Sequence, residues 1–401
     1  MNTLSAAPVA QASTSSAAAL QVRMVAGEAS GDLLAARLLQ GLQQRWPQVQ
    51  AAGIGGPQLC ARGFEAWWPS DKLAVRGYVE VLRHYREIVG IRRQLQQRLL
   101  ADPPEVFIGV DAPDFNLDLE GQLKARGIKT VHFVAPAVWA WRPERVEKIR
   151  RCVDHVLCIF PFEPELLVQH GIEATYVGHP LAELIPEVPD RIAARQALGW
   201  SDGPDQRVVA LLPGSRKAEI AHLLPRFLAA AVLMRQQRPD VAFVLPAVPA
   251  LQSDIERAVQ QAGLAGVVRV VRGQSHTVLA ACDVTLIASG TATLEAALFK
   301  RPMVIAYHMN WLSWQLTQRK RLQPWVGLPN ILARDFVVPE LLQEQATPAA
   351  LAQATLAWLD DSPVGRARLQ ALEQSFIDMH HTLRRDSTVL ATHAIETLLA
   401  R

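Results

Sequence analysis

The sequence predicts an α/β protein in which two parallel sheets are each covered by helices on both faces. Short apolar runs alternate with stretches of helical periodicity from Val22 onward, a rhythm typical of parallel strands joined by crossover helices. A second series of such runs begins at Val208, after a stretch over 180–205 that is punctuated by proline and glycine. At 401 residues the chain is also long for a single hydrophobic core. We therefore expect two Rossmann-like halves.

The expected domain boundaries follow from these runs. Residues 1–20, rich in alanine, serine and glutamine, are expected to be a disordered tail. Residues 21–200 form the first Rossmann-like domain and 201–365 the second. Residues 366–401 are expected to be helical from their three- and four-residue apolar spacing, and packing back on the first domain is one possibility. The expected strands are Val22–Ala26, Val49–Gly53, Val106–Val110, Thr130–Val134, His155–Ile159, Thr175–Val177, Val208–Leu212, Val241–Leu245, Val267–Val271, Val284–Ile287 and Met303–Ala306.

The composition excludes several classes of protein. An apolar share of 50% and a charged share of 20% are ordinary for a globular chain, and a net charge of +3 is too small to indicate nucleic-acid binding. The four cysteines show no C-x-x-C spacing, which favours reduced thiols over a disulfide framework or a zinc site. No apolar run reaches the ~18 residues of a transmembrane helix, and the tail lacks the pattern of a secretory signal. Any membrane contact is therefore expected to be peripheral.

Chemistry is expected in the loops after the strands, because open parallel sheets bind ligands beyond the carboxyl ends of their strands. Asp111 follows the apolar strand VFIGV, and its carboxylate could take a proton from a substrate hydroxyl or cap the next helix. Asp114 is expected to be structural. The loop that contains Glu28 and Ser30 is neither G-x-G-x-x-G nor a Walker loop, which disfavours NAD and ATP chemistry. Its two glycines allow close approach of a ligand, although an ordinary strand–helix turn explains them equally well.

A first anion-binding loop is expected in the second half. Gly214, Ser215 and Arg216 follow the strand at Val208–Leu212 and precede a helical pattern. The backbone N–H groups after Gly214 would face an anion at the helix start, and the guanidinium can bind phosphate oxygens in a fork.

A second loop of this kind is expected at Ser289, Gly290 and Thr291, whose small side chains allow a phosphate to approach a helix start. Glu295 lies one turn further and could accept hydrogen bonds from a ribose diol. Two such loops in one half indicate a nucleotide diphosphate. Asn330 follows a proline and could face the ligand or stabilise a turn. The chain has no D-x-D motif, so no metal ion is expected, and helix N-termini and cations would meet the diphosphate charge.

Three aromatic segments admit two interpretations each. Trp139, Trp141 and Arg142 could shape a sugar or acyl-chain pocket, or the rings could fill a core. The stretches Trp67–Arg98 and Trp311–Trp325 mix apolar and basic residues, which suits a surface that meets anionic lipid. An ordinary amphipathic core helix explains each stretch as well.

Six loops, in order, resemble those of lipid-A-disaccharide synthases, the inverting glycosyltransferases of lipid A assembly. They are VAGEASGD at 25–32, GVDAPDFN at 109–116, VWAWR at 138–142, LLPGSR at 211–216, ASGTATLE at 288–295 and LPNILA at 328–333. The resemblance implies a GT-B fold, with two Rossmann-like domains facing across a cleft, and no cofactor. It implies transfer of 2,3-diacylglucosamine from UDP to the 6-hydroxyl of 2,3-diacylglucosamine 1-phosphate (lipid X).

The resemblance also assigns roles to residues. Asp111 matches the essential aspartate, the expected general base, and Arg216 the arginine at the donor phosphates; these two are the expected catalytic residues. Glu28, Ser30, Glu295 and Asn330 match other cleft positions. One departure is the loop 307–310, which has fewer basic residues than expected, and whether His308 replaces a basic contact is left open.

The implied partners are UDP-2,3-diacylglucosamine, lipid X and the cytoplasmic face of the inner membrane, which the protein would bind peripherally. No nucleic acid is expected, and a homodimer is left open. Two alternatives remain at this point. One is another GT-B-like enzyme, such as a UDP-N-acetylglucosamine epimerase or transferase that acts on non-acylated sugars. The other is a nucleotide-sugar-binding regulator without chemistry, against which the carboxylate of Asp111 at a strand end argues.

Overall fold

The computed structural model describes residues 19–73, 78–139, 144–200, 206–309, 314 and 322–401. The strands of the first sheet are β1 (Gln21–Ala26), β2 (Gln50–Gly55), β3 (Glu65–Pro69), β4 (Val106–Val110), β5 (Lys129–Phe133), β6 (His155–Cys158) and β7 (Ala174–Tyr176). Those of the second are β8 (Val208–Leu212), β9 (Ala242–Ala247), β10 (Val268–Arg272), β11 (Val284–Ala288), β12 (Met303–Tyr307) and β13 (Glu340–Leu342).

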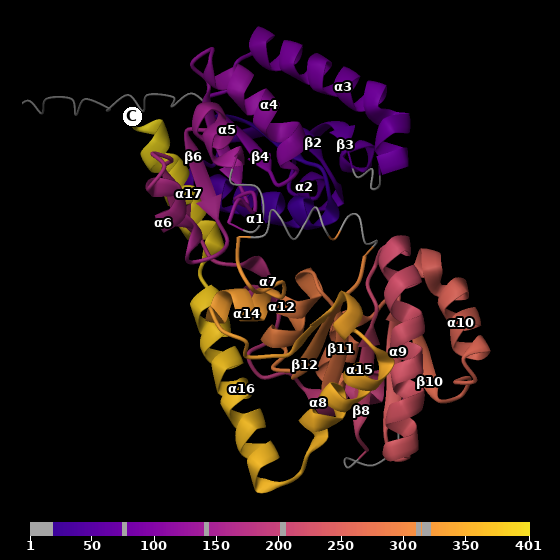
Figure 1. Cartoon of the computed structure of the whole chain (residues 1–401). Coiled ribbons are helices and arrows are strands. Elements are labelled where there is room, and N and C mark those ends of the chain that lie inside the picture. Colours follow the sequence, from indigo (N-terminus) through magenta and orange to yellow (C-terminus); the bar gives the residue numbers. More distant parts are fainter. Residues whose placement is uncertain (1–18, 74–77, 140–143, 201–205, 310–313, 315–321) are drawn as a thin grey trace, which may run out of the picture. The chain divides into compact units, whose positions relative to one another are not determined.

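The strand orders are β3-β2-β1-β4-β5-β6-β7 and β10-β9-β8-β11-β12-β13 (Figure 1). β1 runs parallel to both β2 and β4, and β8 runs parallel to both β9 and β11. The order of each sheet therefore reverses beside its first strand, as in Rossmann-like folds. The predicted fold class, α/β with two Rossmann-like parallel sheets, is confirmed.

Helices connect the strands of both sheets. In the first part of the chain they are α1 (Ala29–Arg45), α2 (Pro57–Cys60), α3 (Tyr78–Ala101), α4 (Pro113–Lys124), α5 (Arg145–Cys152), α6 (Glu163–Val168), α7 (Pro180–Leu184) and α8 (Arg191–Ala197). They continue with α9 (Lys217–Gln237), α10 (Gln252–Gln261), α11 (Ser275–Ala281), α12 (Thr291–Leu298), α14 (Leu328–Ala333), α15 (Pro348–Leu356), α16 (Pro363–Leu383) and α17 (Ser387–Leu399). Short 3-10 turns are η1 (Ser70–Lys72), η2 (Pro249–Leu251), η3 (Gln343–Gln345) and η4 (Ala357–Leu359).

Every strand that the sequence predicted is present within two residues of its expected bounds, including the edge strands β7 and β10. β4 and β8 have the predicted bounds, and all their residues are buried. Such strands read as continuous apolar runs because both faces of a parallel sheet are covered. Two further strands, β3 and β13, were not predicted; both lie at sheet edges and are at most partly buried.

The stretch Trp67–Arg98, which we expected as a candidate membrane surface, packs largely against the first sheet. Trp67 and Trp68 lie on the edge strand β3, not on a helix. Three residues of α3 enter a core cluster with Phe107 of β4; they are Ile91, Leu95 and Leu99. The core-helix interpretation therefore holds for the described side chains of α3, whereas those over 78–85 lie outside the described part.

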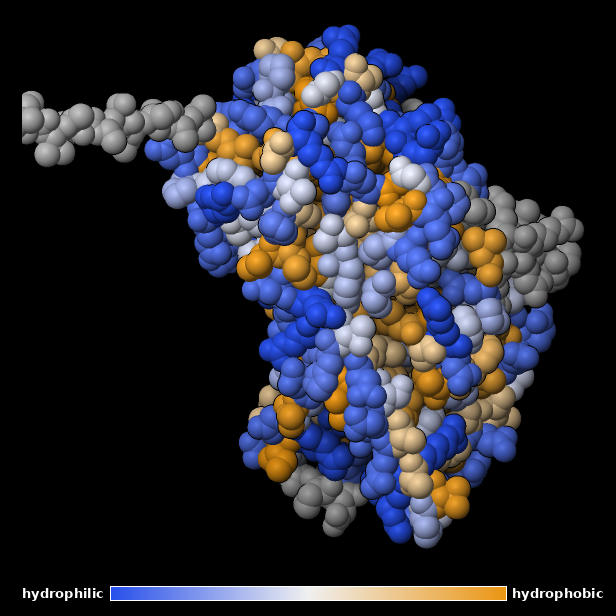
Figure 2. Space-filling model, turned by 90° about the vertical axis from the view of Figure 1, so that its left-hand side faces the viewer, coloured by the Kyte–Doolittle hydropathy of each residue, from blue (hydrophilic) through white to orange (hydrophobic). Residues whose placement is uncertain are grey.

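None of the described helices is long and apolar enough to cross a membrane. Figure 2 shows one face of the molecule, on which apolar side chains form small groups separated by hydrophilic ones. The described side chains of that face thus form no continuous apolar patch of the kind that marks an interaction surface.

The chain divides into two compact units that cross the predicted boundaries. The first comprises 1–134, 149–156 and 391–401, and the second 135–148 and 157–390. Within the first unit, Arg45 at the end of α1 donates to Glu396 of α17 at 2.8 Å. The C-terminal end of the chain is therefore part of the unit that contains its first strand.

Replacing Gly109 by alanine should destabilise the protein. A Cβ atom at this position of β4 would lie 2.1 Å from Glu120 Oε1 and 2.9 Å from Asn116. Because both neighbours are fully buried, we expect a loss of about 1–3 kcal/mol, measured from urea unfolding curves. The control is Gly90→Ala in α3, where nothing lies within 4 Å and alanine should be neutral or stabilising. Equal stability of the two variants would contradict the packing described here.

Candidate active site

The predicted loops lie at the points where the order of each sheet reverses. β1 and β4 pair through Ala26 and Val110, their last residues, so the loops with Glu28 and Asp111 leave the sheet side by side. β8 and β11 pair through Leu212 and Ile287, which brings the loops with Arg216 and Ser289 to one edge of the second sheet. Ligands of open α/β sheets bind at such switch points.

Asp111 lies on a left-handed turn. Its φ is 53° and that of Ala112 is 44°, a conformation that costs ~1–3 kcal/mol for each residue without a compensating contact. Asp111 N–H donates to the carbonyl of Phe133 at 2.8 Å, and the Nδ2 of Asn116 donates to the carbonyl of Asp111 at 2.8 Å. These contacts fix the backbone of the turn, and Asp111 itself is half-buried.

A buried acid–imidazole pair lies beneath this turn. Glu120 Oε1 and His132 Nδ1 are 2.8 Å apart, and both side chains are fully buried. Gly109 makes room for the glutamate, because a Cβ there would overlap it. Asn116, which holds the Asp111 carbonyl, touches the same glycine. The turn therefore rests on a packed polar layer between α4 and β5.

The loop after β1 adjoins the Asp111 turn. A Cβ on Gly27 would lie 3.7 Å from the Cβ of Ala112. Glu28 is half-buried at the N-cap of α1, and Ser30 is exposed in the first turn of that helix. Asp32 instead has a structural role, since its buried carboxylate accepts hydrogen bonds from the backbone N–H groups of Gly56, Gln58 and Leu59.

In the second sheet, a glutamate side chain lies at the first of the two predicted anion-binding loops. The N–H groups of Ser215 and Arg216, which we expected to face a diphosphate, donate to Glu219 Oε2 at 3.0 and 3.2 Å. A glutamate at the third position of α9 thus occupies the donors at its own helix start. The φ of Gly214 is 116°, and a Cβ there would lie 2.5 Å from Glu219, so this position requires glycine. The Arg216 side chain remains 70% exposed, with its Nη1 3.5 Å from Glu219.

The start of α12 has no such occupant. Gly290 is its N-cap with φ 155°, no side chain caps the helix, and Thr291 is exposed. Ser289 Oγ donates to the carbonyl of Val326 at 2.9 Å, which ties this loop to the next one. Glu295 Oε2 lies 3.5 Å from Nε2 of His276, and this contact raises the pKa of the imidazole. The amides of α12 are therefore the better placed of the two sets to bind an anion.

Asn330 is fully buried and does not present its amide to a ligand. Its Nδ2 donates to the carbonyl of Val338 and to Glu340 Oε1, both at 2.9 Å, and its Oδ1 accepts from Val338 N–H at 3.0 Å. Glu340 also accepts from the N–H groups of Val326 and Gly327. Asn330 thus fixes the shape of the loop 326–330.

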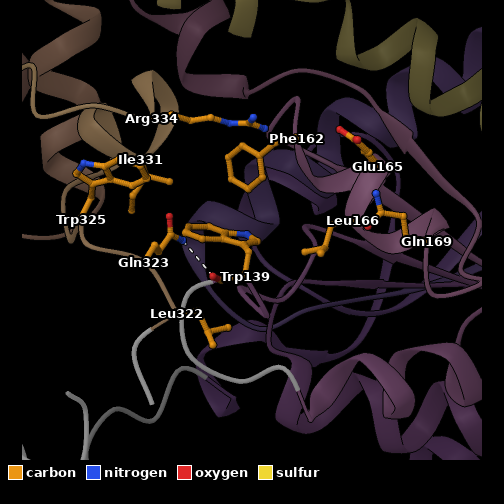
Figure 3. A pocket seen from close by; sticks show the side chains of 10 residues that line it. All are labelled: Trp139, Phe162, Glu165, Leu166, Gln169, Leu322, Gln323, Trp325, Ile331 and Arg334. Carbon is orange, nitrogen blue, oxygen red and sulfur yellow. Dashed lines mark hydrogen bonds between the residues drawn. The ribbon is translucent and has the colours of Figure 1, made fainter. Parts of the chain in front are cut away.

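A cavity of about 350 Å³ lies within the second unit, a size typical of ligand pockets (Figure 3). It is lined by Trp139, Phe162, Glu165, Leu166, Gln169, Leu322, Gln323, Trp325, Ile331 and Arg334. The Nε2 of Gln323 donates to the carbonyl of Trp139 at 3.0 Å across this pocket (Figure 3). Aromatic walls with polar groups between them suit a ligand that has both apolar and hydroxyl surface. Trp139 is therefore a pocket residue that the sequence left undecided.

Behind this wall, Glu163 is buried and holds Trp139 in place. It accepts a hydrogen bond from Trp139 Nε1 at 3.0 Å and from Phe160 N–H at 3.0 Å. Burial raises the pKa of this carboxyl to about 7. His179 caps α7 by accepting from Leu181 N–H, and burial lowers its pKa to about 4, which fits a structural histidine.

Two of the predicted aromatic segments lie wholly or partly outside the described residues. Trp141 and Arg142, and most of the stretch Trp311–Trp325, lie outside the described residues. Within the described part of the chain, no group of three or more His, Cys, Asp or Glu side chains is placed to hold a metal ion.

Glu219 was missed by the sequence analysis, although a glutamate three residues after a helix cap is a known capping pattern.

Comparison with known proteins agrees with the six-loop resemblance. The sequence profile described as "Lipid-A-disaccharide synthetase" matches residues 22–395. The lipid-A-disaccharide synthase of Albidiferax ferrireducens is 65% identical over 95% of this chain and 97% of its own. That of Verminephrobacter eiseniae is 60% identical over 96% and 98%. Among solved structures, the S. aureus MnaA–UDP complex matches with a TM-score of 0.65 and 11% identity over 95% of this chain and 97% of its own, a likeness of fold.

The raised pKa of Glu163 predicts a pH-dependent stability. Because the unfolded carboxyl ionises near pH 4.5 and the buried one near 7, its contribution is complete below 4.5 and is lost as the pH rises to about 7. At about 1.4 kcal/mol per pH unit, the loss is on the order of 3 kcal/mol. Glu163→Gln should remove this dependence, so the stability of wild type relative to the variant should fall across that range in urea unfolding series. Glu165→Gln, at an exposed position of the same helix, is the control, and parallel curves for all three proteins would refute the assignment.

Proposed function

The chain belongs to the lipid-A-disaccharide synthetase family, and on that premise we propose that it transfers 2,3-diacylglucosamine from UDP to the 6-hydroxyl of lipid X. The products would be the β(1→6)-linked disaccharide 1-phosphate and UDP. The observation that most supports this chemistry is the Asp111 turn, where a carboxylate follows a central strand at a switch point and its backbone is fixed by Asn116.

The proposed reaction is a single in-line displacement. The Asp111 carboxylate takes the proton of the acceptor hydroxyl, whose oxygen forms the new bond to the anomeric carbon of the donor. The bond from that carbon to the diphosphate oxygen breaks, and its electron pair leaves with UDP. One displacement inverts the α-linked donor to the β product.

The charge that develops on the leaving UDP would be met in the second unit. The amides at the start of α12 and the exposed guanidinium of Arg216 are the candidate donors, and a helix of this kind favours an anion at its N-terminus. Thr291 adds an exposed hydroxyl at the same helix start. Glu295 keeps its proposed role at the ribose, in competition with His276. No residue of this mechanism requires a metal ion or a cofactor.

Both proposed substrates are acylated, so we propose that the enzyme works at a membrane surface as a peripheral protein, on the cytoplasmic face of the inner membrane. The absence of a membrane-spanning helix from the described residues is compatible with this arrangement. Co-sedimentation of the purified chain with phospholipid vesicles tests it, and a protein that stays in the supernatant at low salt would argue against it.

The proposed activity is tested with the purified chain, UDP-2,3-diacylglucosamine and lipid X, with UDP release and product mass as readouts. We expect UDP and disaccharide in equal amounts, also with EDTA present. Turnover of non-acylated UDP-sugars alone would instead indicate an epimerase or another transferase. UDP release without lipid X would indicate hydrolysis.

Replacing the proposed general base should abolish most of the chemistry but not donor binding. Asp111→Asn keeps the shape of the side chain and removes its basicity, and a general base contributes about 10²–10⁴ in rate. We therefore expect kcat to fall by that order while UDP affinity, measured by calorimetry, stays unchanged. Asp114→Asn, at an exposed position in the first turn of α4, is the matched control and should remain active. An Asp111→Asn enzyme with near wild-type turnover would rule out this role.

Removing the exposed guanidinium should affect binding and rate together. Arg216→Ala loses a contact to the leaving diphosphate, for which about 10²–10³ in kcat is a typical cost. UDP affinity should fall as well. Arg216→Lys keeps the charge without the forked geometry, so its kcat and UDP affinity should lie between those of wild type and Arg216→Ala. Unchanged UDP affinity and rate in Arg216→Ala would exclude the contact.

A further inference from the structure

A cluster of basic side chains lies between α9 and the end of β12. On α9, His222 and Arg226 follow Glu219 at spacings of three and seven residues, so the three share one face of the helix. Arg226 Nη2 lies 3.0 Å from His308 Nε2, and Nη1 donates to the carbonyl of His222 at 2.6 Å. The rings of His222 and His308 are 5.4 Å apart. Both α9 residues are half-buried and thus partly accessible from solvent.

The arginine fixes the tautomer of His308. A guanidinium has no lone pair to offer, so His308 Nε2 must accept this hydrogen bond and the ring proton must lie on Nδ1. Burial, followed by the charges of Arg226 and His222, lowers the pKa of His308, which keeps the ring neutral. The Nδ1–H group is buried and has no hydrogen-bond partner among the described residues. His308 therefore contributes an unused donor.

Gln343 contributes a second unused hydrogen-bond donor. This residue of η3 is 5% exposed, and its Oε1 accepts from the N–H of Met309, the neighbour of His308, at 3.3 Å. Because the side-chain oxygen already accepts this hydrogen bond, the remaining group, Nε2, is a donor. It is also buried and has no partner in the part of the chain that the structure describes. A buried donor without a partner costs ~1–3 kcal/mol, so two of them beside an arginine require an explanation.

The chemistry of the cluster favours an anion. The two buried groups without a partner, His308 Nδ1–H and Gln343 Nε2, are both donors, and the charge on the arginine is positive. Two acids lie nearby: Glu344, whose charge acts to raise the pKa of His308, and Glu219, which is bound to Ser215 and Arg216. In the described part of the chain, the hydrogen bonds of Arg226 go to His222 and His308 and not to either acid. A phosphate group has enough acceptor oxygens to serve an arginine and two further donors at once.

An aromatic pair adjoins the cluster. Tyr307, which directly precedes His308, lies 6.5 Å from the ring of Trp314, and Trp314 is 8% exposed. A ligand that places its charge at Arg226 would therefore have the half-buried ring of Tyr307 beside it, with the buried Trp314 packed against that ring. This combination suits an anion carried by an amphipathic molecule better than a free inorganic ion.

We propose that His222, Arg226, His308 and Gln343 form a binding site for the phosphate group of a lipid. Two sources share this chemistry: the acceptor's own 1-phosphate, an assignment that rests on the proposed function, and the headgroup of a membrane phospholipid, which does not. In either case the site would orient an acylated molecule through its phosphate.

Kinetics distinguish the first source. Arg226→Gln should raise the KM for lipid X by about 10- to 100-fold, the usual effect of one lost hydrogen bond to a charged group, with the KM for the donor unchanged. An acceptor without the 1-phosphate should be a poor substrate for wild type and should react no worse with the variant. Arg226→Lys should recover part of the loss. Arg235→Gln, an exposed arginine of the same helix, is the charge-matched control.

Vesicle binding distinguishes the second source and does not depend on activity. If the site binds a headgroup, wild type should co-sediment with phosphatidylcholine vesicles that contain phosphatidic acid several-fold better than Arg226→Gln does. The two should not differ on phosphatidylcholine alone. Gln343→Leu removes one of the proposed donors and keeps every charge. If Arg226→Gln weakens acceptor binding or vesicle binding, Gln343→Leu should weaken the same kind of binding. Thermal melting is used to confirm that both variants are folded. If both folded variants match wild type in acceptor KM, acceptor discrimination and vesicle binding, the proposal is wrong.

Discussion

Parallel pairing makes neighbouring strands end at one edge, and this constraint determines where the protein can do chemistry. Because Ala26 pairs with Val110 and Leu212 with Ile287, the two strands at each reversal end together. The loops that follow these strands therefore begin at neighbouring positions on the edge of the sheet. The switch point supplies the position, and local contacts such as the bond from Asn116 to the Asp111 carbonyl supply the orientation.

Those local contacts differ in how much strain they hold. The Asp111 turn is left-handed at two successive residues and needs support from a buried layer that includes Glu120 and His132. The loop after β8 concentrates its unusual conformation in Gly214, whose missing side chain admits Glu219. In the first arrangement Asp111 is half-buried at the turn, whereas in the second the Glu219 carboxylate accepts hydrogen bonds from the backbone of its own loop. The same type of strand–helix junction thus yields a chemical group in one sheet and a helix cap in the other.

The sequence predicted the central strands and the loops after them, because both depend on local pattern. VFIGV is apolar throughout as a strand covered on both faces must be, and Asp111 is conspicuous as the charge that ends it. The edge strand β3 could not be recognised, since its two tryptophans also suit a lipid-facing surface. Two contacts join residues from different secondary-structure elements: Glu120 with His132, and Gln343 with Met309. No sequence spacing predicts such contacts. Glu219 is the exception, because its capping pattern was present in the sequence and was overlooked.

The division of the chain into its two units has a consequence for biosynthesis. Residues 391–401 belong with the first strands, and Glu396 is bonded to Arg45. A chain emerging from the ribosome therefore makes most of its first unit early and completes it last, after the whole second unit has been synthesised. During that interval the partly finished first unit would lack its final helical segment. The order of synthesis thus gives this protein a waiting period in which chaperones or proteases could act on an incomplete fold.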